Sequence, residues 1–135
     1  MQLVVDTNII VSALLRKGDT RRLVFSKRFE LFSPDRVKFE IAKNKHEFMQ
    51  KGSMNEEEFL TAVELLLGNV SIVPAEEYAP LKNKADSLCP KGHEDDWPFI
   101  ALSLKLNCGL WSQDSALKKQ SIVNVYSTAG LIALI

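Results

Sequence analysis

Acidic residues at four places in this sequence have the types and spacing to bind a metal ion. Asp6 and Asp114 each follow a short apolar run, and Asp96, with Asp95 beside it, precedes another, while Glu40 lies in an amphipathic segment. Four carboxylates that converge without basic neighbours repel one another strongly. Mg²⁺ or Mn²⁺ would relieve that repulsion, and such ions activate water for displacement at phosphorus. The lack of a His pair or a Cys set beside these acids argues against zinc.

Short apolar runs alternate with longer amphipathic ones, which is typical of an α/β domain with a parallel sheet. The predicted strands are Gln2–Val5, Glu30–Ser33, Val70–Val73, Cys108–Trp111 and Val123–Tyr126. The predicted helices are Ile9–Leu15, Thr20–Lys27, one from Ser33-Pro34 through Val37 and Ile41 to Phe48, one from Ser53 to about Leu67, Tyr78–Leu88, Phe99–Leu106, Ser115–Lys119 and Thr128–Leu134. Pro34 would stand at the first position of its helix, and Ser53 with Glu56 would form a capping box.

These elements predict that the acids meet at one edge of the sheet. The carboxyl ends of parallel strands lie together, and ligands bind there. Asp6 and Asp114 each come directly after a strand, and Asp96 begins the helix that leads into the strand before Asp114. Glu40 lies on the helix after the second strand and can point at the same edge. We therefore expect these side chains to be close in space.

Each acid also has a purely structural interpretation. Asp is a good N-cap residue, so Asp6, Asp95, Asp96 and Asp114 can each cap a helix. Glu40 can be one more solvated helix charge. Capping and metal binding can coexist, so the functional interpretation rests on the set and not on any one member.

Charge, hydropathy and cysteine content limit the kinds of protein that this chain can be. The chain has 135 residues, with 17 basic and 17 acidic side chains, so no overall basic field exists to attract nucleic acid. No apolar run is long enough to span a membrane, and no secretory signal precedes Asp6. Cys89 and Cys108 form no CxxC pair, and we expect each to be a buried thiol. We expect a cytoplasmic protein with no membrane partner.

Four segments in order resemble the PIN-domain family, which includes the toxin nucleases of bacterial and archaeal VapBC modules. The segments are Val4-Val5-Asp6-Thr7-Asn8-Ile9, then Ser33-Pro34 leading to Glu40-Ile41, then Asp96-Trp97-Pro98-Phe99-Ile100-Ala101-Leu102, and last Trp111-Ser112-Gln113-Asp114. Their order and spacing cover nearly the whole chain. One of them alone would be a weak signal, but four in order form a fairly specific one.

The resemblance implies a three-layer α/β/α domain over residues 1–135, with a central parallel sheet of about five strands. It implies an endoribonuclease in which Asp6, Glu40, Asp96 and Asp114 hold one or two Mg²⁺ or Mn²⁺ ions, with Asn8 and Ser112 in support. It further implies an RNA substrate, a homodimer and, for toxin-type relatives, an antitoxin protein. The alternative is a non-catalytic PIN-like module that binds RNA or protein.

Two departures from the family pattern are visible. Asp95 and Asp96 are adjacent, so either can be the metal ligand, and Asp96 is favoured because the family's acid usually stands two positions before the Pro-Phe pair. His93 stands where related sequences often carry another acid; it is either an exposed loop residue or an outer donor to the site. Glu40 is also flanked by lysines that can pair with it instead: Lys38, Lys43 and Lys45.

A basic stretch and an apolar stripe each have more than one interpretation. An early basic stretch can contact RNA phosphates, meet an antitoxin, or be a solvated helix face: Arg16, Lys17, Arg21, Arg22, Lys27 and Arg28. An apolar stripe can be core or part of a groove for an antitoxin helix: Phe48, Met49, Met54, Phe59, Leu60 and Val63. We expect Trp111 in the core. Trp97 can stack a base of a single strand, but we expect it to pack at its helix start. A haloacid-dehalogenase-like phosphatase would need a second Asp where this chain has Asn8.

Overall fold

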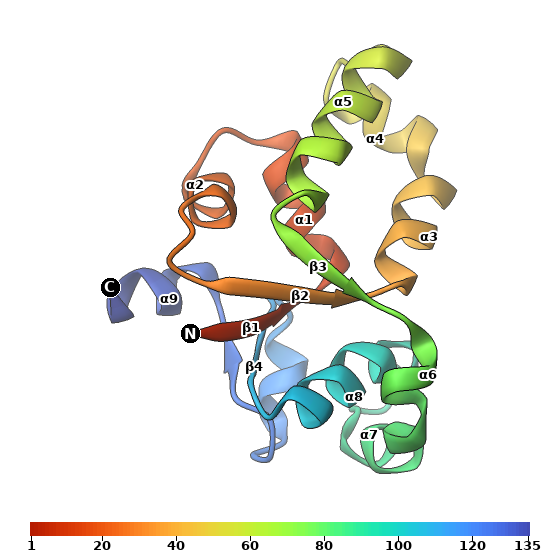
Figure 1. The fold of residues 1–135 in the computed structure, drawn as a ribbon, viewed down its shortest axis with the longest axis vertical. Coiled ribbons are helices and arrows are strands. Elements are labelled where there is room, and N and C mark those ends of the chain that lie inside the picture. The colour runs from red at the N-terminus through yellow and green to blue at the C-terminus, as the bar shows by residue number, and fades with distance from the viewer.

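The computed structural model describes all residues from 1 to 135 as a parallel sheet between two layers of helices (Figure 1). The strands are β1 (Gln2–Val5), β2 (Glu30–Pro34), β3 (Val70–Val73), β4 (Gly109–Trp111) and β5 (Val125–Tyr126). The α-helices are α1 (Thr7–Leu15), α2 (Asp19–Phe25), α3 (Arg36–Lys43), α4 (Lys45–Lys51), α5 (Glu56–Leu67), α6 (Ala75–Tyr78), α7 (Lys82–Leu88), α8 (Trp97–Leu106) and α9 (Thr128–Leu134). Three 3₁₀ turns complete the chain: η1 (Ala79–Leu81), η2 (Glu94–Asp96) and η3 (Ser115–Lys119).

The sheet has the order β3-β2-β1-β4-β5, and every neighbouring pair is parallel. The chain moves outward from β1 through β2 to β3, then returns to the other side of β1 for β4 and β5. The strand order therefore reverses between β1 and β4, where Val5 pairs with Trp111. In open parallel sheets, the crevice beyond the strand ends at such a reversal is the usual ligand site.

Successive side chains of β1 point to opposite faces of the sheet and so belong to two separate hydrophobic cores. Leu3 and Val5 pack with α1 to α5 and α9, whereas Val4 packs with α6 to α8. All three are 0% exposed, as expected for the centre of a sheet covered on both faces. Figure 1 shows the two helical layers above and below the strands. The expected α/β/α architecture with five parallel strands is thus confirmed.

The helix predicted from Ser33-Pro34 through Phe48 is wrong in two respects. Pro34 lies in β2, paired with Val73, and α3 begins only at Arg36. The helix then breaks at Asn44, whose side-chain amide donates to the Glu40 carbonyl (3.0 Å). An Asn side chain that competes for backbone groups favours such an ending, so α4 is a separate helix.

Two other helix starts also differ from the predictions. Ser53 has a left-handed backbone (φ 51°) and caps nothing. Asn55 caps α5 instead, because its Oδ1 accepts from the Glu58 amide (2.8 Å) while the Glu58 carboxylate accepts from the Asn55 amide (3.0 Å). The segment Tyr78–Leu88 is divided into α6, η1 and α7, because Pro80 cannot continue a helix.

The tryptophans lie where the sequence predicts them, whereas the cysteines are more exposed than predicted. Trp111 is fully buried and Trp97 packs on Tyr78 at the start of α8, as predicted. Cys89 and Cys108 are free thiols, but both are half-buried and not buried, because they lie at the C-terminal ends of helices near the surface. None of the helices has the length and apolarity needed to cross a membrane.

Replacement of Asn55 tests the observed start of α5. We expect Asn55→Ala to lower the free energy of unfolding by about 1 kcal/mol, because it removes one half of the capping box. Ser53→Ala removes no capping bond and should change it by less than about 0.5 kcal/mol. Urea unfolding followed by circular dichroism measures both, and a larger loss for Ser53→Ala would contradict the assignment.

Candidate metal centre

Asp6 joins the end of β1 to the start of α1 and is the most deeply buried acid of the set. Its Oδ1 accepts a hydrogen bond from the Ile9 amide (3.0 Å), so it caps α1, and only 8% of the residue is exposed. Its own amide donates to the Trp111 carbonyl across the sheet (3.2 Å). The Ser33 hydroxyl donates to the Val5 carbonyl (2.8 Å) and holds the end of β1 from the other side. The carboxylate is therefore fixed in place at the strand reversal.

The surroundings of Asp6 disfavour its negative charge. The pKa of Asp6 is raised to about 6, mainly by burial and in part by the charges of Asp96 and Asp114, whereas the Ser112 hydroxyl and the Ile9 amide act to lower it. A carboxylate held this way gains from a proton or from a metal cation.

Asp96, the last residue of η2, and Asp114, which follows β4, meet at the same edge of the sheet. Asp114 follows β4 and caps η3, with Oδ1 accepting from the Ala116 amide (3.0 Å). The Ser112 hydroxyl accepts from the Asp114 amide (3.1 Å), which orients this turn. Burial raises the pKa of Asp96, as does the charge of Asp114. Asp114 is thus close enough to Asp96 to disfavour the negative charge of Asp96.

His93 lies between these two carboxylates. Its Nδ1 is 3.0 Å from Asp114 Oδ2 and 3.6 Å from Asp96 Oδ2. One ligand atom from each of the three residues lies within 4.8 Å of the others, a spacing that one metal ion can bridge. His93 is therefore not an isolated loop residue, because its imidazole lies beside two of the predicted acids.

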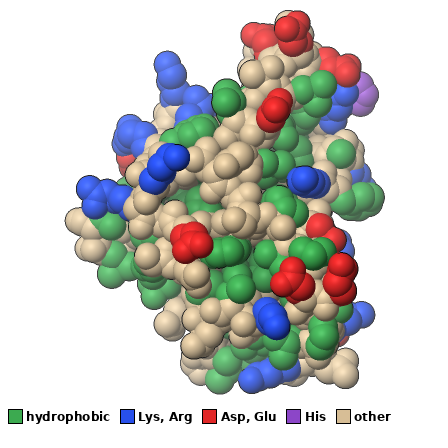
Figure 2. Space-filling view, in the orientation of Figure 1, with side chains coloured by type: hydrophobic (Ala, Val, Ile, Leu, Met, Phe, Trp, Pro, Cys, Tyr) green, Lys and Arg blue, Asp and Glu red, His purple; other side chains and the backbone are tan.

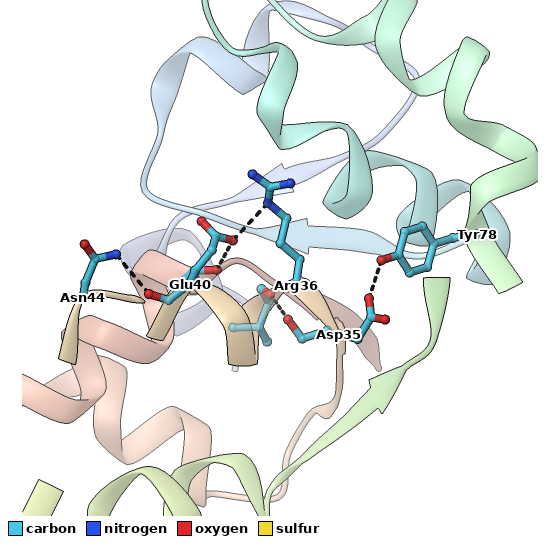
Figure 3. A network of polar contacts seen from close by, with 8 residues as sticks. Asp35, Arg36, Glu40, Asn44 and Tyr78 are labelled. Atoms are coloured by element: carbon cyan, nitrogen blue, oxygen red, sulfur yellow. Dashed lines mark hydrogen bonds and ion pairs between the residues drawn. The ribbon is translucent and has the colours of Figure 1, made fainter. Parts of the chain in front are cut away.

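Glu40 lies on α3, and Figure 3 shows its carboxylate beside the Arg36 guanidinium. The Thr7 hydroxyl donates to its Oε1 (2.9 Å), and Arg36 Nε lies 3.6 Å from the same oxygen. The influence of Glu40 on the pKa of Asp96 puts it near the other acids. The predicted lysine partners do not pair with it; Lys45 instead contacts Glu56 (3.0 Å) because Asn44 starts a new helix before it.

The structure brings most of the expected site residues together. Asp6, Glu40, Asp96 and Asp114 lie at one edge of the sheet, and Ser112 is completely buried beneath them. Asp95 and Asn8 are exposed, and neither side chain makes a hydrogen bond or ion pair with the cluster. Of the two adjacent aspartates, Asp96 is the one that faces the site.

Two partners of the acids were not predicted from the sequence: Thr7 and Arg36. Arg36 precedes Glu40 by four residues, the spacing at which helical side chains pair, and the predicted helix contained both residues, so the sequence did carry a signal for this pair. His93 precedes Asp96 by three residues, one turn of η2. Thr7 was visible only as a cap type beside Asp6.

The donors fit a hard or intermediate divalent cation. Carboxylate oxygens suit Mg²⁺ and Mn²⁺, and an imidazole nitrogen among them suits Mn²⁺ better than Mg²⁺. The partly exposed Asp96, Asp114 and His93 leave one side of the cluster open to solvent. A phosphate group can therefore approach.

Comparison with protein families matches residues 4–125 to the family described as the PIN domain. The chain belongs to the PIN-domain family. No curated protein matches this PIN domain. Among solved structures, it is similar to a chain in the crystal structure of VapBC2 from Rickettsia felis bound to a DNA fragment from their promoter. The two chains are 16% identical, with a TM-score of 0.67 over 94% of this chain and 98% of the other, a likeness that concerns the fold.

Removal of the Asp6 charge should stabilise the metal-free protein. The pKa of Asp6 lies above its unfolded value of 3.8, so its protonated form favours folding. That stability is present below about pH 4 and is lost as the pH rises to about 6. Asp6→Asn keeps the shape without the charge, and we expect it to exceed the wild type by about 2–3 kcal/mol at pH 8 in EDTA.

Urea unfolding of both proteins at pH 4 and at pH 8 measures this difference, with Glu64→Gln, an exposed acid on α5, as the matched control. Equal stabilities of wild type and Asp6→Asn at pH 8 would contradict the burial argument.

Proposed function

We propose that this PIN domain is a metal-dependent endoribonuclease that hydrolyses RNA phosphodiester bonds. The observation that carries the proposal is the convergence of Asp6, Glu40, Asp96 and Asp114 from four separate segments at the strand reversal. Structural caps alone would not require four acids to share one edge. Residues 1–135 would act as a single nuclease domain.

Asp6, Asp96 and Asp114 would hold Mg²⁺ or Mn²⁺, with His93 as a nitrogen donor on the open side. Such an ion supplies activated water and neutralises charge that develops at phosphorus. The capping bonds to Asp6 and Asp114 hold these two carboxylates before any ion arrives. Little reorganisation is then needed on binding.

Glu40 and Arg36 would act on the reactants. Thr7 holds the Glu40 carboxylate in place, where it can accept a proton from the attacking water or hold a second ion. The Arg36 guanidinium lies beside Glu40 and is partly exposed (38%), so it can contact a phosphate oxygen. This local cation matters because the chain has no net positive charge.

Cleavage of a fluorescent-quenched RNA panel tests the proposal. We expect cleavage with Mg²⁺ or Mn²⁺ and none with EDTA. Asp6→Asn should lower the cleavage rate at least about a hundredfold. Mutation of a residue that only hydrogen-bonds to a metal ligand already lowers activity by up to about that factor. Glu64→Gln should cleave like the wild type.

Equal cleavage by wild type and Asp6→Asn would refute the proposed site. No cleavage by a folded protein that binds Mn²⁺ would favour a non-catalytic PIN module that binds RNA or protein.

We also propose that this domain is the toxin of a toxin–antitoxin module, with an antitoxin helix seated on the apolar side of α5. A groove of about 250 Å³ lies there between α1, α2 and α5, and most of its lining is apolar: Ala13, Leu14, Arg21, Phe25, Met54, Ala62, Leu65 and Leu66. Phe25 and Leu65 are 41% and 60% exposed. Figure 2 shows apolar side chains on the surface between α2 and α5. Part of the predicted stripe is core, since Phe48 and Phe59 are buried.

Leu65→Glu should release such a partner. Tagged protein purified from its native host is expected to carry a small protein that inhibits RNA cleavage, because an apolar helix face fits this groove. Leu60→Glu changes an equally exposed residue of α5 outside the groove and should retain the partner. Equal retention by both variants, measured by mass spectrometry of the eluate, would contradict the proposed seat.

A cytoplasmic location fits an RNA substrate and an antitoxin partner. A homodimer follows from the family resemblance, and light scattering during gel filtration decides it.

A further inference from the structure

A shallow hollow of about 330 Å³ lies beside the acidic cluster, between the starts of α3 and α8. It is lined by Asp35, Arg36, Phe39, Ala75, Tyr78, Trp97 and Pro98. Phe39 directly precedes Glu40, and Trp97 directly follows Asp96. The hollow therefore adjoins the proposed catalytic site, and Arg36 in its lining lies 3.6 Å from Glu40 Oε1.

Aromatic rings form one side of the hollow. The rings of Tyr78 and Trp97 have centroids 5.8 Å apart and are tilted by 55°. The Tyr78 hydroxyl donates to Asp35 Oδ1 (2.6 Å), as Figure 3 shows, and the Ala75 amide donates to Asp35 Oδ2 (3.2 Å). Both carboxylate oxygens of Asp35 are thus engaged, and Tyr78 is held rigidly.

Phe39 also lines the hollow and is largely exposed to solvent. Its exposed fraction of 64% is the highest of any large apolar side chain in this protein. Exposure of an aromatic ring next to a ligand site, on a helix whose buried face is supplied by Val37 and Ile41, is the pattern of a binding surface.

Arg36 connects the hollow with the acids. Its Nε is buried and has no hydrogen-bond partner, and its nearest acidic atom is Glu40 Oε1 at 3.6 Å. Aromatic rings beside a guanidinium are the groups on which bases of a single strand stack, while the cation contacts the backbone.

We infer that this hollow stacks one nucleobase of single-stranded RNA, with Phe39 and Trp97 against the base and Arg36 on the adjoining phosphate. The inference rests on the proposed function. It adds that one stacked base fixes the position of the RNA strand relative to the catalytic acids. The nucleotide next to the scissile phosphate occupies the hollow, because Glu40 and Asp96 adjoin its lining residues.

Binding of a fluorescein-labelled single-stranded RNA to the cleavage-defective Asp6→Asn protein tests this inference by fluorescence anisotropy. In that background, we expect Phe39→Ala to weaken binding about tenfold and Phe39→Tyr to restore it, since loss of one stacked base costs about this factor or more. Leu60→Ala, an exposed apolar residue outside both the hollow and the groove, is the control and should bind like its parent.

Abasic substitutions in the RNA place the base. One abasic position should weaken binding about tenfold with Phe39 present and have no effect with Phe39→Ala, because both changes remove the same stack. Equal affinities of the Asp6→Asn protein with and without Phe39→Ala would overturn the inference.

Failure of the inference can be separated from failure of the proposed function. If wild-type protein cleaves RNA with metal and Phe39→Ala leaves both binding and cleavage unchanged, only the stacking inference falls. If neither cleavage nor RNA binding occurs with any variant, both fall.

Discussion

The buried carboxylate of Asp6 is the constraint on which the site depends. It caps α1 at the end of the central strand, so it cannot move away from the neighbouring acids without loss of the helix start. Burial and the charges of Asp96 and Asp114 raise its pKa to about 6. No basic side chain contacts Asp6 itself, so a bound cation is the remaining source of positive charge at neutral pH.

The sheet order turns distant parts of the chain into one surface. Because β4 returns to the side of β1 opposite β2, Asp6 and Asp114 follow adjacent strands, while α3 and α8 bring Glu40 and Asp96 over the same edge. The helices that supply these acids also supply Phe39 and Trp97. One topological feature thus positions both the acids and the hollow beside them.

Patterns of apolar residues predicted the five strands and most helices, because burial on both faces of a parallel sheet leaves a clear signal. The exact ends of helices and strands were harder to predict. Pro34 in a strand, the break at Asn44 and the cap at Asn55 each depend on local hydrogen bonds that several neighbouring residues could have made. The same limit applies to the site: strand ends predicted where the acids meet, but the contacts of His93 and Arg36 depend on side-chain directions in three dimensions.

Crystals soaked in Mn²⁺ and measured at the manganese absorption edge would test the central claim most directly. We predict an anomalous peak coordinated by Asp6, Asp96 and Asp114, with His93 within ligand distance and Asp95 turned away. No peak at millimolar Mn²⁺, or a peak elsewhere on the protein, would show that these acids are structural caps and would contradict the account.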